Sequence, residues 1–204
     1  MHGLESIIGD WRVAAFIAAA LVAFIWGAAG RVRWDLACNA SGNPAMRIPE
    51  RSWSYDAHDL QAFANAAQHV GIGRQSALDF YVHNILKRSD ICFAIALAAV
   101  TAFVCYEIAV APLRCVLFNW AAVPLGAMAI LYGIADVAED LKLASILQHP
   151  QNIDRADAAA ANMLTRIKFV ALTLSAIGVA IFLVIAGAEL GAGKLLGRRA
   201  AARA

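Results

Sequence analysis

Four stretches of the sequence are apolar over enough residues to cross a membrane as helices. They cover about 13–29, 91–110, 116–137 and 169–188, and charged residues bound each of them. A membrane-spanning helix needs about 20 predominantly apolar residues. In lipid, every backbone N–H and C=O must be hydrogen-bonded within the segment, which favours helices over open strands. The pattern therefore predicts four transmembrane helices.

The alternatives to four retained spans fit the pattern less well. The first and fourth stretches are apolar on all faces, whereas a helix on the surface of a soluble protein needs a polar side. The first stretch is also longer than the roughly 7–15 apolar residues of a signal peptide, and both acids and bases precede it. We therefore expect a single membrane domain over residues 1–204 whose first helix is retained.

The long first loop, 30–90, predicts a helical cap on the bundle. Ser54 or Asp56 can cap a first helix, and a second amphipathic stretch leads directly into the second span. The apolar positions at helical spacing are Leu60, Phe63, Ala67 and Val70 in the first helix, and Leu78, Tyr81, Val82, Ile85 and Leu86 in the second. In the third loop, Asp154 can cap a short helix over 156–165 that joins the fourth span.

With four spans, the first and third loops lie on one side of the membrane, and both termini and the short turn around Pro112 lie on the other. The positive-inside rule gives conflicting indications. The bases flanking the first loop (Arg31, Arg33, Lys87 and Arg88) favour a cytoplasmic loop side, whereas the Arg-rich tail after Glu189 favours cytoplasmic termini. We expect cytoplasmic termini in a bacterial inner (plasma) membrane, because the tail is dense in arginine and has no acid.

Composition agrees with this environment. The chain of 204 residues is 61% hydrophobic and 16% charged, against about 45–50% and about 25% in soluble domains. This excludes a disordered protein, and the net charge of +2 gives no case for nucleic-acid binding. The four cysteines form neither a CxxC motif nor a disulfide framework. No catalytic residue set and no cofactor are predicted.

The few charged residues gather where the spans meet the loop side. Asp90 opens the second span, and acids close the third at a spacing that places them on one helix face. At the C-terminus of a helix the macrodipole disfavours negative charge, so these acids need cations. The candidate polar cluster comprises Arg74, Asp90, Asp136, Glu139, Asp140, Arg166 and Lys168.

Two interpretations of this cluster stay open. It can be an ion-pair network that holds the first loop against the ends of the spans. It can also be a site for a lipid headgroup, a small polar ligand or a divalent cation, because carboxylates suit hard cations and ionisable residues in membranes are candidates for function. No ligand spacing matches a known metal site, so the metal is left unspecified.

Small residues and tryptophans indicate packing and depth. Small-residue faces allow close helix contact within the chain or with a second copy or another membrane subunit. These residues are Ala94, Ala98 and Ala102 in the second span, and Ala176, Gly178 and Ala180 in the fourth. The tryptophans, Trp26 apart, are predicted to form interfacial belts, so membrane lipids are expected partners. They are Trp11, Trp26, Trp34, Trp53 and Trp120.

The stretch 55–168 carries four short motifs, and their residues are Gly73-Arg74, Asp90, Asp136-Val-Ala-Glu139-Asp140 and Thr165-Arg-Ile-Lys168. In this pattern the chain resembles a loosely defined group of uncharacterised bacterial four-helix membrane proteins. The group has Asn at the position of Asp140, and Phe-Pro where this chain has Ile91-Cys92. The resemblance implies the same fold and no activity.

The expected fold is all-α, a four-transmembrane-helix bundle with an amphipathic helical cap from the first loop. The expected function is that of a structural or assembly protein of the membrane that is not an enzyme. The alternative is a lipid-headgroup- or cation-binding protein that uses the charged cluster. A small transporter is the third interpretation, and it is disfavoured because no charge lies near the middle of a span.

Overall fold

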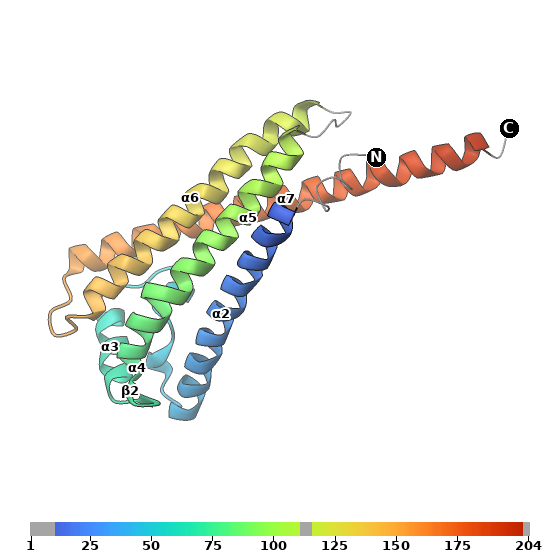
Figure 1. Cartoon of the computed structure of the whole chain (residues 1–204). Helices are drawn as coiled ribbons and strands as arrows, with labels where there is room; N and C mark the ends of the chain where they lie inside the picture. The colour runs from blue at the N-terminus through green and yellow to red at the C-terminus, as the bar shows by residue number, and fades with distance from the viewer. Residues whose placement is uncertain (1–10, 111–115, 202–204) are drawn as a thin grey trace.

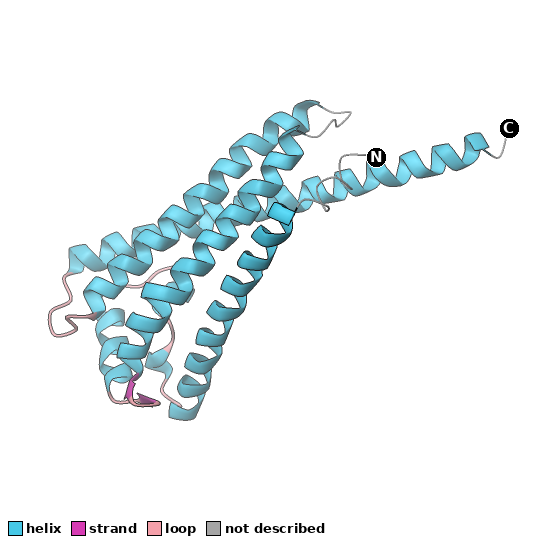
Figure 2. Cartoon of the chain, viewed as in Figure 1, coloured by secondary structure: helices cyan, strands magenta, loops and turns pink. Residues whose placement is uncertain are grey.

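The computed structural model describes residues 11–110 and 116–201, and four of its helices are long and apolar enough to cross a membrane. They are α2 (Trp11–Ser41), α5 (Ile91–Val110), α6 (Val116–Leu147) and α7 (Arg155–Ala201). The all-α four-helix fold is confirmed, with helix dominating the ribbon (Figures 1 and 2). The turn predicted around Pro112 lies outside the described residues.

The spans pack through small residues of the same chain. α6 lies against α5 and α7, and α2 runs along α5 (Figure 1). A Cβ added to Gly133 of α6 would lie 2.6 Å from the Cβ of Ala98 in α5. A Cβ at Gly178 in α7 would likewise meet Leu125 of α6. The predicted small-residue faces therefore serve contacts within the chain, and contacts between subunits stay a prediction.

Three of the spanning helices continue past the predicted spans on the loop side. α2 runs to Ser41, α6 reaches Leu147 instead of 137, and α7 begins at Arg155. The predicted cap of α7 is confirmed, because the backbone N–H of Ala156 donates to Asp154 Oδ1 over 3.2 Å. The longer α6 corrects one argument: its acids lie inside the helix, and the macrodipole acts only within the last turn.

The first loop folds as a helical cap at the loop-side end of the bundle. It contains the 3₁₀ turns η1 (Pro44–Met46) and η2 (Pro49–Arg51), helix α3 (Ala57–Gln68), the hairpin β1 (Gly71–Ile72) with β2 (Gln75–Ser76), and α4 (Ala77–Phe80). Of the two predicted caps Asp56 is used: it accepts from the Asp59 backbone at 2.9 Å, and Asp59 accepts in return at 3.0 Å. Such a capping box fixes the start of α3.

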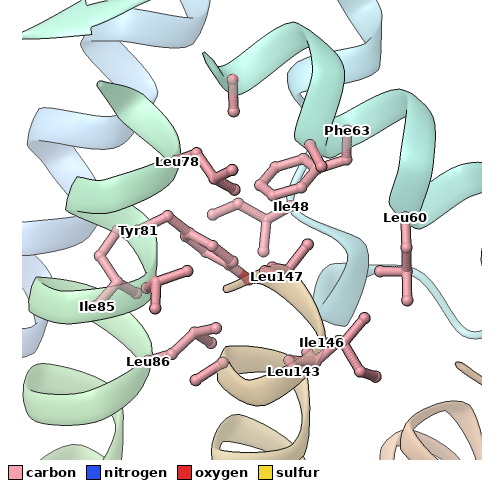
Figure 3. Close-up of a cluster of buried hydrophobic side chains, with 14 of the residues drawn as sticks. Ile48, Leu60, Phe63, Leu78, Tyr81, Ile85, Leu86, Leu143, Ile146 and Leu147 are labelled. Carbon is pink, nitrogen blue, oxygen red and sulfur yellow. The ribbon is translucent and has the colours of Figure 1, made fainter. Parts of the chain in front are cut away.

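The largest buried apolar cluster joins the cap to the ends of α2 and α6. Figure 3 shows Phe63 of α3 and Tyr81 on the helix leading into α5 facing Leu143 and Leu147 of α6. Trp34 of α2 stacks on Phe63 and Tyr81, with ring centroids 5.6 and 5.0 Å apart, and is 0% exposed. The interfacial position predicted for Trp34 is therefore wrong, because its ring belongs to the cap core.

The helix that leads into α5 has an unusual winding. Between α4 and α5 the backbone forms a π-helical segment of ten residues, η3 (Tyr81–Asp90), and the whole stretch runs on as one helix. The predicted amphipathic face of this stretch is confirmed, since its apolar positions are buried. π-Helical turns are rare and concentrate at functional sites. This one ends at Asp90, the first residue of the predicted charged cluster.

Candidate functional site

Five residues of the predicted cluster come together at the loop-side ends of the spans. Asp90 lies where η3 meets α5, the three acids lie on α6, and Lys168 lies on α7. All five are buried, with exposed fractions between 0% for Glu139 and 8% for Lys168. Burial of this many charged side chains is uncommon, because burial removes their hydration. The cost of that loss is offset only when the groups are paired or bind an ion.

Two residues of the predicted cluster lie elsewhere. Arg74 is exposed in the turn of the β1–β2 hairpin, and Arg166 is exposed on α7. Among the described residues, the buried acids form their ion pairs with Arg31 and Lys168 instead. The assignment of Arg74 and Arg166 to the cluster is therefore corrected: nearness in sequence predicted contact with the acids, but both side chains lie at exposed positions.

One half of the cluster is centred on Lys168. Its Nζ lies 2.8 Å from Asp136 Oδ1 and also contacts Glu139 Oε2. Asp136 accepts a further hydrogen bond from the Tyr132 hydroxyl at 2.9 Å. In this half one lysine is shared by two carboxylates, each of which has a second polar neighbour, so it has the character of a structural ion-pair network.

Tyr55 connects this half to the cap. Its hydroxyl donates to Glu139 Oε1 over 3.2 Å, and the Thr165 hydroxyl lies 3.1 Å from Tyr55 and contacts Glu139. Burial, followed by the charge of Glu139, raises the pKa of Tyr55. The phenol therefore stays protonated and available as a donor over the physiological range.

The other half of the cluster is a group of three buried carboxylates, Glu50, Asp90 and Asp140, which we call the carboxylate site. One oxygen from each lies within 4.8 Å of the others. Glu50 comes from η2 of the cap and accepts a hydrogen bond from Tyr81 at 2.9 Å. Asp90 pairs with Arg31 of α2 at 3.1 Å. The site thus joins α2, the cap, α5 and α6.

Two oxygens of the carboxylate site lack the partner that a buried carboxylate needs. Asp140 is 1% exposed and Asp90 is 2% exposed, and the Oδ2 atom of each is buried with no hydrogen-bond donor within the described part of the chain. Buried polar atoms in native proteins nearly always have a partner, so each exception calls for an explanation. Asp140 Oδ2 is the sharpest case, because no cation of the chain forms an ion pair with this residue within the described ranges.

The charges of the cluster do not balance. Within 11–110 and 116–201, five buried acids face two cations, Lys168 and the half-buried Arg31. Lys168 forms its ion pairs with Asp136 and Glu139, so within the described ranges Arg31 is the one cation in ion-pair contact with the carboxylate site. Buried charges are paired or coordinate metals. The site can therefore accept further positive charge. The atoms that would coordinate a cation are all carboxylate oxygens, which suit hard cations such as Mg²⁺ or Ca²⁺.

The site is closed on the side of the solvent. Two cavities lie at the loop-side end, of about 730 Å³ beside Trp34 and about 520 Å³ beside His149, and none of the three carboxylates lines either of them. Every member of the site is at most 6% exposed. The burial of all three carboxylates fits a small ion.

A second acidic group needs no ion to explain it. Asp56, His58 and Asp59 also bring three potential ligand atoms together, but all are exposed. Two of them form the capping box of α3. The backbone N–H of Asp59 is the main cause that lowers the pKa of Asp56. Helix capping accounts for this group.

Four apolar spans joined by an ordered cap define an integral membrane protein. Comparison with protein-family models, with curated proteins and with solved structures finds no match to the chain. The resemblance inferred from the sequence motifs therefore stays a prediction, and function has to be argued from the site itself.

Proposed function

We propose that this integral membrane protein binds a divalent cation at the carboxylate site, at the loop-side boundary of the membrane. The observation that carries the proposal is the buried Oδ2 atom of Asp140, which has no hydrogen-bond donor among the described residues and lies beside two further carboxylates. The π-helical segment that ends at Asp90 supports it, because such segments concentrate at functional sites. Oxygen ligands of this kind suit Ca²⁺, Mg²⁺ or Mn²⁺.

The chemistry of the site favours a cation over the other ligands that the sequence left open. A lipid headgroup brings an anionic phosphate, which three carboxylates would repel. A purely structural network explains the half around Lys168, where each acid contacts the lysine. It does not explain Asp140, with which no described base forms an ion pair. The closed geometry also favours binding over catalysis, because an enzyme must admit its substrate.

Binding of Mn²⁺ tests this proposal directly. Purified protein in mild detergent, titrated with Mn²⁺ and followed by the loss of the free-ion EPR signal, should bind one ion per chain. Asp140→Asn and Glu50→Gln each remove one charged ligand while keeping the shape, and each should weaken binding by about tenfold or more, a difference of about 1.4 kcal/mol. Asp59→Asn, in the exposed acidic group, should bind like wild type.

The proposal fails if wild type binds no Mn²⁺, or if Asp140→Asn and Glu50→Gln bind as tightly as wild type. Circular dichroism and elution volume establish that each variant is folded, so that lost binding reports on the site. Asn and Gln still place an oxygen at the same position. Binding that is weaker in these variants, but is restored at a higher concentration of the divalent cation, therefore also supports coordination by these side chains.

We also propose that the protein lies in a bacterial inner membrane with cytoplasmic termini. A cysteine at the exposed Gln151, in the connection between α6 and α7, reports the side of the loops. In a chain whose native cysteines are replaced by serine, Gln151→Cys should react with a membrane-impermeant maleimide in intact cells. Labelling only after the inner membrane is opened would place the loop side in the cytoplasm instead.

A further inference from the structure

We infer that the ion at the carboxylate site acts as a latch that holds the cap segment 44–55 on the membrane helices, so that the affinity of the cap for the bundle depends on the ion. The inference rests on the proposed cation binding and adds its consequence. The segment, which we call the latch segment, contains both 3₁₀ turns and ends just before α3.

The latch segment contacts the membrane helices through several side chains, among them Arg51 with Asp35 and Trp53 with Phe169, and Glu50 is the one that enters the carboxylate site. Glu50 is buried, while Arg47 and Arg51 on either side of it are exposed. Met46 and Ile48 enter the cap core, and Tyr55 bonds Glu139 at the far end. Glu50 is therefore the one charged side chain of the segment that is buried among acids of the membrane helices in the described structure.

Binding of the ion changes the interaction between Glu50 and the carboxylates of the membrane helices from unfavourable to favourable. Without a cation, the carboxyl groups of Glu50, Asp90 and Asp140 lie within 4.8 Å of one another, where they must either take up protons or repel one another. Like charges at this separation in a medium of low dielectric repel strongly. With a divalent cation, the same three carboxylates share one positive centre, and they come from three different elements of the fold. Ion binding thus converts a repulsive contact into a cross-link.

Charged groups around the latch segment do not replace the ion. Arg51 pairs with Asp35 of α2 at 3.0 Å, but this pair is exposed on both sides. Exposed pairs contribute about 0–1 kcal/mol and are screened by salt. The hydrogen bond from Tyr81 to Glu50 is present whether or not an ion is bound. The difference between the two states therefore lies in the carboxylate site.

The two arginines that flank Glu50 make the latch measurable by trypsin. Cleavage after Arg47 or Arg51 requires the segment to leave the surface, so its rate reports the population of the released state when release and return are fast. If the ion dissociates whenever the segment is released, an ion concentration of 100 times the Kd lowers the population of the released state by about 100-fold at most. In wild type we expect saturating Mn²⁺ to slow cleavage at these two sites by about tenfold or more relative to chelator.

The hairpin provides a control within the same digest. Arg74 is exposed in the β1–β2 turn, away from the carboxylate site, so its cleavage rate should not respond to Mn²⁺. Normalising to Arg74 also removes any effect of the ion on trypsin. In Asp140→Asn, cleavage after Arg47 and Arg51 should be the same with and without Mn²⁺, while Asp59→Asn should behave like wild type.

The outcomes separate the latch from the cation site itself. Mn²⁺ binding by EPR with unchanged cleavage after Arg47 and Arg51 would overturn the latch and leave the proposed function in place. Absence of Mn²⁺ binding would overturn the proposed function. Slower cleavage at Arg74 by the same factor would show general tightening of the protein, and would likewise contradict a latch confined to segment 44–55.

Discussion

Replacing Lys168 by Met is expected to destabilise the protein by about 3–5 kcal/mol, because it leaves Asp136 and Glu139 buried without their shared cation. Removing one partner of a buried ion pair is far more destabilising than replacing the whole pair by apolar residues, since the remaining charges keep their desolvation penalty. For a chain of this size the loss corresponds to a fall in Tm on the order of 10 °C. The measurement is thermal unfolding in mild detergent.

Two further variants make the reason for this loss testable. Lys142→Met breaks a lysine–aspartate pair of the same chemistry, with Asp157, but both of its side chains are partly exposed, and the change should be about 1 kcal/mol or less. Adding Asp136→Asn and Glu139→Gln to Lys168→Met removes the orphaned charges and should restore most of the lost stability. Equal effects of Lys168→Met and Lys142→Met, or a triple variant less stable than the single one, would contradict the ion-pair account.

Much of the fold could be predicted from the sequence because membrane helices follow from uninterrupted apolar runs. The residues that the pattern assigns to the second span, 91–110, are helical throughout as α5. The caps at Asp56 and Asp154 follow from local hydrogen-bonding chemistry. The end of α6 lies beyond the predicted span because past the headgroup region a helix needs no long apolar run, and tertiary packing against the cap decides its length.

The site could be predicted only in part. Its acids on α6 and its lysine on α7 are marked by lying where the apolar spans end or begin. Glu50 carries no such mark, because it lies in a polar loop among Pro49 and Arg51, where an acid is ordinary. In the sequence Arg31 is one of the residues that flank the first span, and only its 3.1 Å contact with Asp90 assigns it to the cluster. Contacts between residues this far apart in sequence need the fold.

Asp140→Asn is expected to change stability in opposite directions with and without a cation. In chelator the variant removes one of three crowded like charges, and should be more stable than wild type by up to about 2 kcal/mol. With Ca²⁺ at about 100 times the Kd, wild type should gain about 2.7 kcal/mol, a rise in Tm of about 5–10 °C, because the ion binds only the folded state. The variant has lost a charged ligand and should gain little at the same concentration.

The measurement that tests the cation site most directly is therefore the Tm of wild type and Asp140→Asn in mild detergent, each in chelator and in saturating Ca²⁺. The cation site predicts a crossing: the variant melts above wild type in chelator and below it in Ca²⁺. Parallel behaviour of the two proteins, with Ca²⁺ shifting neither or both equally, would contradict a divalent-cation site formed by Glu50, Asp90 and Asp140.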